Sequence, residues 1–178
     1  LPPPAATTSG KVDSIDGLVA IAGGADSDTI NIDDSANTAN KVVTLTSNTL
    51  RGLDMPRGVS YSNAEDLNLW LGTGTDGLYI DSTHAGTTDV FMGDGNATVN
   101  ERDDTVAIRS ISGVTTVHGQ GGNDSFYVGV QAANDNFDTQ FKQAVAAAAN
   151  DNQVNALFHR TNTNGIGVPA SFGSKCSG

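Results

Sequence analysis

Aspartates that follow glycine-rich turns are the residues of this sequence best suited to chemistry. They stand in the turns "GGADSD", "GTGTD", "GDGN", "RDD" and "GQGGND", and the candidate metal ligands are Asp28, Asp76, Asp94, Asp104 and Asp124. Calcium prefers about six to eight oxygen ligands from carboxylates and backbone carbonyls. Aspartate side chains also cap turns by accepting backbone N–H groups. The same residues therefore fit either calcium binding, with Asp104 and Asp124 as the central pair, or turn formation alone.

These turns belong to a repeat in which a short apolar alternation follows each aspartate. The copies are "GGADSDTINI", "LGTGTDGLYI", "MGDGN" continued by "RDDTVAI", and "GQGGNDSFYV". Asp104 and Asp124 are 20 positions apart, whereas Asp76 and Asp104 are 28 apart, which an insertion at residues 97–102 explains. A second pair of segments, residues 85–96 and 112–123, shows the same recurrence. A period near ~20 residues is typical of one coil of a stacked solenoid.

Within each repeat the apolar residues alternate with a period of two, which predicts short strands. We expect strands at residues 42–46, 67–71, 78–80, 105–108 and 115–117. Stacked coils would align apolar side chains in two internal ladders, one of Ile30, Leu78, Val106 and Phe126, the other of Ile32, Ile80, Ile108 and Val128. The sequence therefore predicts an all-β fold, a right-handed parallel β-solenoid of about five rungs with a C-terminal α-helical cap.

The segment "GQGGNDSFY" resembles the nonapeptide repeat of RTX (haemolysin-type) calcium-binding β-rolls, from which it departs at Gln120, where that family has a glycine. The longer coil is similar to the degenerate parallel β-helix repeats of large extracellular surface proteins. The resemblance implies a β-helix or β-roll with calcium as its cofactor. It also implies a location outside the cell or at its surface.

Four regions differ in composition. Residues 1–13 form a Pro/Thr-rich linker or arm, 14–130 the solenoid, 131–160 a helical segment and 161–178 a Gly/Ser-rich tail that holds the lone Cys176. The helical segment carries an apolar face of Phe137, Phe141, Ala144, Val145 and Ala148. A solenoid end exposes its last hydrophobic coil, so this helix is expected to cap that end or to pack on a neighbouring subunit.

The net charge and the terminal segments limit the kinds of partner that the sequence predicts. Twenty acidic against nine basic residues give a net charge of -11, which disfavours nucleic acid. No apolar run is long enough for a membrane span. The opening "LPPPAATTSG" fits a processed end of a secreted precursor, and two sequons place candidate glycosylation sites at Asn96 and Asn123.

Catalytic arrangements are sparse. His84, His118 and His159 lack metal-hydrolase spacing. A polysaccharide-active enzyme would use carboxylates with a basic residue, and the candidates for such a shared face are Asp81, Asp89 and Arg109. We therefore expect no enzyme. The leading prediction is an extracellular structural or adhesive module that assembles with copies of itself or within a larger surface assembly. The alternatives are a calcium-dependent module that binds glycans or an ice-like surface through threonine arrays, and a polysaccharide-active enzyme using Trp70, Tyr61 and Tyr79.

Overall fold

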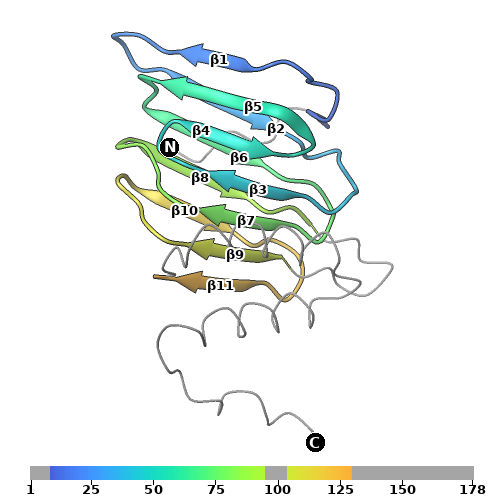
Figure 1. The fold of residues 1–178 in the computed structure, drawn as a ribbon. Helices are drawn as coiled ribbons and strands as arrows, with labels where there is room; N and C mark the ends of the chain where they lie inside the picture. Colours follow the sequence, from blue (N-terminus) through green and yellow to red (C-terminus); the bar gives the residue numbers. More distant parts are fainter. Residues whose placement is uncertain (1–8, 95–103, 130–178) are drawn as a thin grey trace, which may run out of the picture.

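A computed structural model describes residues 9–94 and 104–129, and this part of the chain contains strands and no helix (Figure 1). The all-β class is therefore confirmed. The predicted cap and tail (131–178) and the insertion (97–102) lie outside the described residues. The strands are β1 (Val19–Ala22), β2 (Thr29–Asp33), β3 (Val42–Leu45), β4 (Thr49–Gly52), β5 (Met55–Ser62), β6 (Asp66–Trp70), β7 (Gly77–Ile80), β8 (Thr87–Phe91), β9 (Thr105–Ile108), β10 (Thr115–His118) and β11 (Ser125–Val128).

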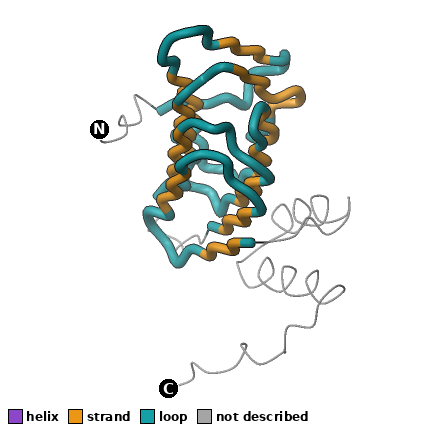
Figure 2. The backbone as a smooth tube through the Cα atoms, turned by 90° about the vertical axis from the view of Figure 1, so that its left-hand side faces the viewer, coloured by secondary structure: helices purple, strands orange, loops and turns teal. Residues whose placement is uncertain are grey.

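The strands form two sheets that face each other across the core. A seven-stranded sheet has the order β1-β5-β4-β3-β7-β9-β11, and a four-stranded sheet has the order β10-β8-β6-β2. From β5 onward, consecutive strands alternate between the two sheets, so each passage of the chain contributes one strand to each layer. Figure 2 shows the result as two columns of strands joined by loops.

The second half of the body follows the predicted repeat. In the seven-stranded sheet β7, β9 and β11 are parallel, and Leu78 pairs with Val106, which pairs with Phe126. In the four-stranded sheet β8 and β10 are parallel with Thr88 opposite Thr115, as the similarity of residues 85–96 and 112–123 predicts. The parallel strand register that the spacing of the aspartates predicts is therefore observed in this region.

The first half departs from the prediction of parallel coils throughout. Strand β4 is antiparallel to both β3 and β5, so the chain reverses twice before it enters β6. The reversal places the passes β1-β2-β3 and β5-β6-β7 side by side, because β1, β2 and β3 pair in parallel with β5, β6 and β7 respectively.

This reversal also corrects the two predicted ladders. Ile30 and Ile32 lie in the four-stranded sheet, where they pair with Leu67 and Leu69. The ladders of the seven-stranded sheet instead begin at β3, where Val43 pairs with Leu78 and Leu45 pairs with Ile80. The glycine-rich turn before β2 resembles the turns before β7 and β11, but it leads the chain into the opposite layer.

The turn between β4 and β5 is held by packing rather than by favourable turn residues. Leu53 and Asp54 both have positive φ, 55° and 58°, a backbone region that costs a non-glycine residue about 1–2 kcal/mol. The Leu53 side chain is fully buried, and Asp54 forms an ion pair with the nearly buried Lys41. Burial of a leucine contributes about 1.5–3 kcal/mol, which offsets most of the backbone strain at the two residues.

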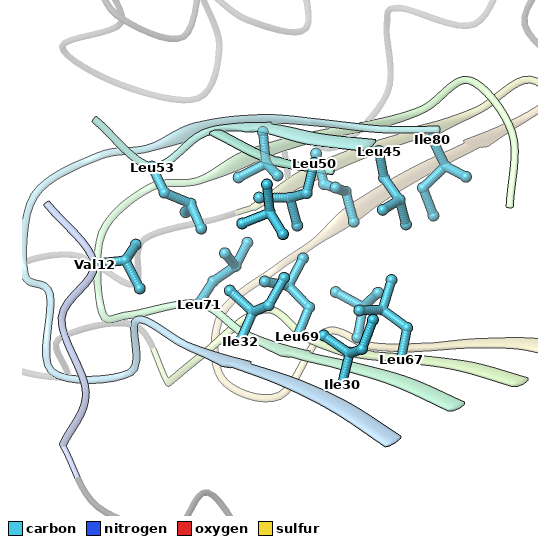
Figure 3. Packing of buried hydrophobic residues seen from close by; sticks show 14 of the residues in the cluster. Val12, Ile30, Ile32, Leu45, Leu50, Leu53, Leu67, Leu69, Leu71 and Ile80 are labelled. Carbon is cyan, nitrogen blue, oxygen red and sulfur yellow. The ribbon is translucent and has the colours of Figure 1, made fainter. Parts of the chain in front are cut away.

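Apolar side chains from both sheets interlock between the layers (Figure 3). The fully buried members come from β3, β4, β6 to β9 and the adjoining turns, and include Val43, Leu45, Leu50, Leu53, Leu67, Leu69, Leu78, Ile80, Val90, Met92 and Val106. Val12 also belongs to this cluster, so the body includes residues that the sequence placed in the N-terminal arm.

Candidate functional site at the aspartate corner

One corner of the coil carries an aspartate immediately before three successive strands of the seven-stranded sheet. Asp76 precedes β7, Asp104 precedes β9 and Asp124 precedes β11, while Lys41 takes the equivalent place before β3. We call this row the aspartate corner. The parallel pairing of the strands brings these four residues, which are far apart in the sequence, into one stack.

Each carboxylate of the corner accepts a hydrogen bond from the backbone of the neighbouring coil. The Lys41 N–H donates to Asp76 Oδ1 (2.7 Å), the Asp76 N–H to Asp104 Oδ1 (2.7 Å), and the Asp104 N–H to Asp124 Oδ1 (3.0 Å). The carbonyl oxygens of the same residues accept bonds from the strands below, such as Thr105 N–H to Asp76 O at 2.9 Å. Side chain and backbone therefore tie each coil to the next.

This geometry supplies the contact that the turn-capping interpretation requires. Asp76 and Asp104 are each 1% exposed. Their own N–H groups, and the N–H groups that donate to their carboxylates, are therefore shielded from water. A buried N–H without an acceptor costs about 1–3 kcal/mol, and a charged acceptor strengthens the bond. Across the described residues, 9–94 and 104–129, no three histidine, cysteine or acidic side chains converge on a point suited to a metal ion. Calcium binding at the corner stays a prediction.

Two of the five predicted ligands lie at other corners. Asp28 precedes β2 of the four-stranded sheet, where its N–H donates to the Glu65 carboxylate at 2.8 Å. Glu65 thereby performs for that sheet the capping that aspartates perform for the other. Asp94 is exposed and follows β8, where it forms an isolated bridge with Gly121. The structure brings together Asp76, Asp104 and Asp124 only.

Gln120, which replaces a glycine of the resembled repeat, keeps the glycine conformation. Its φ is +65°, in the left-handed region that favours glycine. The side chain compensates, because Gln120 Oε1 accepts the N–H of Gly93 at 2.8 Å. The departure from the repeat therefore adds a contact between coils.

An aromatic row that the sequence analysis missed runs along the outer face of the four-stranded sheet. The Trp70 and Phe91 rings are stacked with centroids 5.6 Å apart, and the Phe91 and His118 rings with centroids 4.5 Å apart. The strand register that aligns these residues is the signal that could have found them. Because the rings stack on one another, both faces of Phe91 are already covered, which favours a structural role for the row.

The residues suggested for an enzyme do not gather. Arg109 bonds Asp81 at 2.6 Å beside the seven-stranded sheet, whereas Asp89 lies on β8 of the other sheet. Tyr61 donates its hydroxyl to the Thr46 carbonyl at 2.6 Å, and burial raises the pKa of Tyr61 to about 12.

The threonine pairs of β8 and β10 also do not make an outward array. Thr88 is fully buried, and its register partner Thr115 points to the same side of the sheet. Only Thr87 and Thr116 face outward, and they are not partners in the register. A flat threonine surface would need outward threonines aligned on neighbouring strands.

The last coil of the described residues exposes apolar side chains. Phe126 is 47% exposed, although its ladder partner Val106 is fully buried. Val128 is 79% exposed, and its partner Ile108 is partly buried. Ile111 and Val114, in the connection from β9 to β10, are also exposed. We call Ile111, Val114, Phe126 and Val128 the apolar end. Of the two sequons, Asn123 is exposed beside this end, and Asn96 lies outside the described residues.

Comparisons with protein-family models, with curated proteins and with solved structures give no match for this chain. Among the described residues no helix is long and apolar enough to cross a membrane.

Proposed function

We propose that the chain is an extracellular structural or adhesive module whose body is a right-handed parallel β-solenoid of about five coils. One observation carries the proposal: successive coils are tied in register by parallel pairing, by the aspartate corner and by stacked apolar ladders. Such a body gains rigidity from repetition, which suits a spacer or a building block. The inserted hairpin of β3, β4 and β5 is then an interruption of the solenoid.

The apolar end is the proposed contact surface of the module. Exposed apolar side chains on the terminal coil of a repeat protein need a cover for solubility. The cover is either the predicted helix at residues 131–160 or another copy of the chain. A heterologous contact between copies would build an open assembly of the kind that a filamentous surface structure requires.

Sedimentation of the full chain over a wide range of concentration tests the proposed function. Assembly of the wild type that is lost in a Val114→Ser/Val128→Ser variant supports it. Arg51→Ser is the control, because Arg51 is exposed on β4, which lies between β3 and β5 and away from both edges of the seven-stranded sheet. Both variants change exposed positions, so folding should be retained. A wild type that stays monomeric at every concentration would contradict assembly from copies of itself.

Deleting residues 131–178 tests the helical cap separately. If the helix covers the apolar end, the shortened protein should associate, and the added Val128→Ser substitution should weaken that association. A shortened protein that is soluble, monomeric and as stable as the full chain would contradict the cap.

A further inference from the structure

A short N-terminal strap, residues 10–15, lies against the connection between β2 and β3. The Gly10 carbonyl accepts the N–H of Ala36 at 3.0 Å, and the Val12 N–H donates to Asp34 Oδ1 at 3.1 Å. The Val12 side chain points into the core cluster (Figure 3). One of the contacts that hold the strap therefore depends on the Asp34 carboxylate.

Asp34 is a fully buried carboxylate whose two oxygens have different surroundings. Oδ1 accepts the Val12 N–H and the Asn37 amide (3.3 Å). Oδ2 is also buried and has no hydrogen-bond partner. The backbone fixes the residue, because the Asp34 N–H donates to the Trp70 carbonyl at 2.9 Å. An ionised carboxylate with one oxygen shielded from water and left without a donor is costly to bury.

The charged groups around Asp34 come from three elements. Asp13, on the strap, opposes ionisation of Asp34, and Lys41, immediately before β3, favours it. Asp33, the preceding residue on β2, accepts the Ser35 N–H at 3.0 Å, and β6 contributes the backbone carbonyl of Trp70. Burial outweighs the hydrogen bonds and Lys41, so the pKa of Asp34 lies above its ordinary value.

We propose that the strap is a proton-operated latch, closed most tightly when Asp34 is protonated and loosened when the Asp34 carboxylate ionises. The protonated side chain still offers Oδ1 to the Val12 N–H, and it no longer buries a charge beside Asp13. When the strap opens, water reaches both carboxylate oxygens and the pKa returns to its ordinary value. The closed state thus binds the proton more tightly than the open state, and by linkage a rising pH shifts the strap toward opening.

Amide hydrogen exchange of the Val12 and Ala36 N–H groups, measured by NMR from about pH 4 to pH 7 and corrected for the intrinsic exchange rate, tests the latch. We expect the opening constant of both amides to rise with pH, by up to about tenfold for each unit by which closure raises the pKa. Exchange of the Leu69 amide, in the middle of β6, reports global unfolding and should not follow the same course.

Two variants separate the latch from a general charge effect. Asp34→Asn keeps an oxygen acceptor for the Val12 N–H and cannot ionise, so its opening constant should not depend on pH. Asp13→Asn removes a charge from the strap and leaves Asp34, so the pH dependence should remain. The proposal is overturned by a wild-type opening constant that does not change with pH, by pH dependence that persists in Asp34→Asn, or by parallel behaviour of the Val12 and Leu69 amides.

Discussion

Replacing Asp104 with alanine tests whether the aspartate corner stabilises the stack of coils. The substitution removes the Oδ1 atom that accepts the Asp76 N–H, and this N–H lies where Asp76 is only 1% exposed. An unsatisfied buried donor costs about 1–3 kcal/mol. For a chain of this length each kcal/mol shifts the unfolding midpoint by about 2–4 °C, so Asp104→Ala should lower the midpoint by several degrees.

Asp104→Asn is the informative partner of this variant. The amide keeps an oxygen acceptor for the Asp76 N–H but loses the charge, and charge-assisted hydrogen bonds are about twice as strong as neutral ones. We expect about half the loss of stability seen for alanine. Asp94→Ala is the control, because Asp94 is exposed and stands at another corner. Surface substitutions of this kind change stability by less than about 0.5 kcal/mol.

Calorimetry or circular dichroism in EGTA measures the three variants without calcium. Equal midpoints for Asp104→Ala and the wild type in EGTA would refute the reasoning, because the hydrogen bond would then contribute nothing. A loss of stability that appears only when calcium is present would instead identify Asp104 as a metal ligand, since an ion bound by the folded state alone stabilises that state.

Three further predictions concern buried or hydrogen-bonded side chains elsewhere in the body. Leu78→Ala should cost about 2–5 kcal/mol in the free energy of unfolding, and Phe126→Ala, in the same ladder but 47% exposed, should cost clearly less; equal losses in denaturant titrations would contradict the burial gradient. Gln120→Ala loses the bond to the Gly93 N–H and keeps the positive φ, whereas Gln120→Gly loses the bond and relieves the strain, so the alanine variant should be less stable by about 1 kcal/mol. Because the folded pKa of Tyr61 is raised to about 12, its contribution to stability should be constant below the unfolded pKa, fall by about 1.4 kcal/mol per pH unit between about pH 10 and pH 12, and level off above the folded pKa. Tyr61→Phe should lose that part of the alkaline decline, as pH-dependent denaturation can show.

The coil repeat of the second half was predictable because its signals are local and periodic. An aspartate precedes each of β7, β9 and β11, and the distances between Asp76, Asp104 and Asp124 give the strand register directly. The segment at residues 97–102 did not hide the pattern, because β7 and β9 pair in the register that the aspartates predict.

The hairpin of β3, β4 and β5 was not predictable in the same way. Its second turn uses Leu53 and Asp54 at positive φ, where a sequence signal would be Asn-Gly or Asp-Gly. Burial of Leu53 holds this turn, and burial follows from the complete fold. When the sequence repeats are aligned without knowledge of the hairpin, Ile30 and Ile32 align with the ladder residues of the other sheet.

The burial of Asp34 was predictable from the alternation of residues in β2. Ile30 and Ile32 alternate into the core, so the next position inward is residue 34, where a carboxylate is unexpected. The alternation therefore predicts a buried carboxylate at position 34. The contact of the strap with Asp34 was not predictable, because the strap adjoins a Pro/Thr-rich segment without strand periodicity. The aromatic row depends in the same way on the register of β6, β8 and β10.

A disulfide between neighbouring coils tests the stacked parallel register most directly. Asp89 and Thr116 are register partners on the outer face of β8 and β10, and neighbouring strands lie within reach of a disulfide. In a Cys176→Ser background, Asp89→Cys/Thr116→Cys should oxidise rapidly within one chain, whereas Asp89→Cys/Thr115→Cys should not, because Thr115 points to the other face. Efficient closure of the first pair alone is the result that stacked coils predict. Failure of that pair, or equal closure of both, would contradict the register of β8 and β10, and with it the stacking of coils on which the proposed structural role depends.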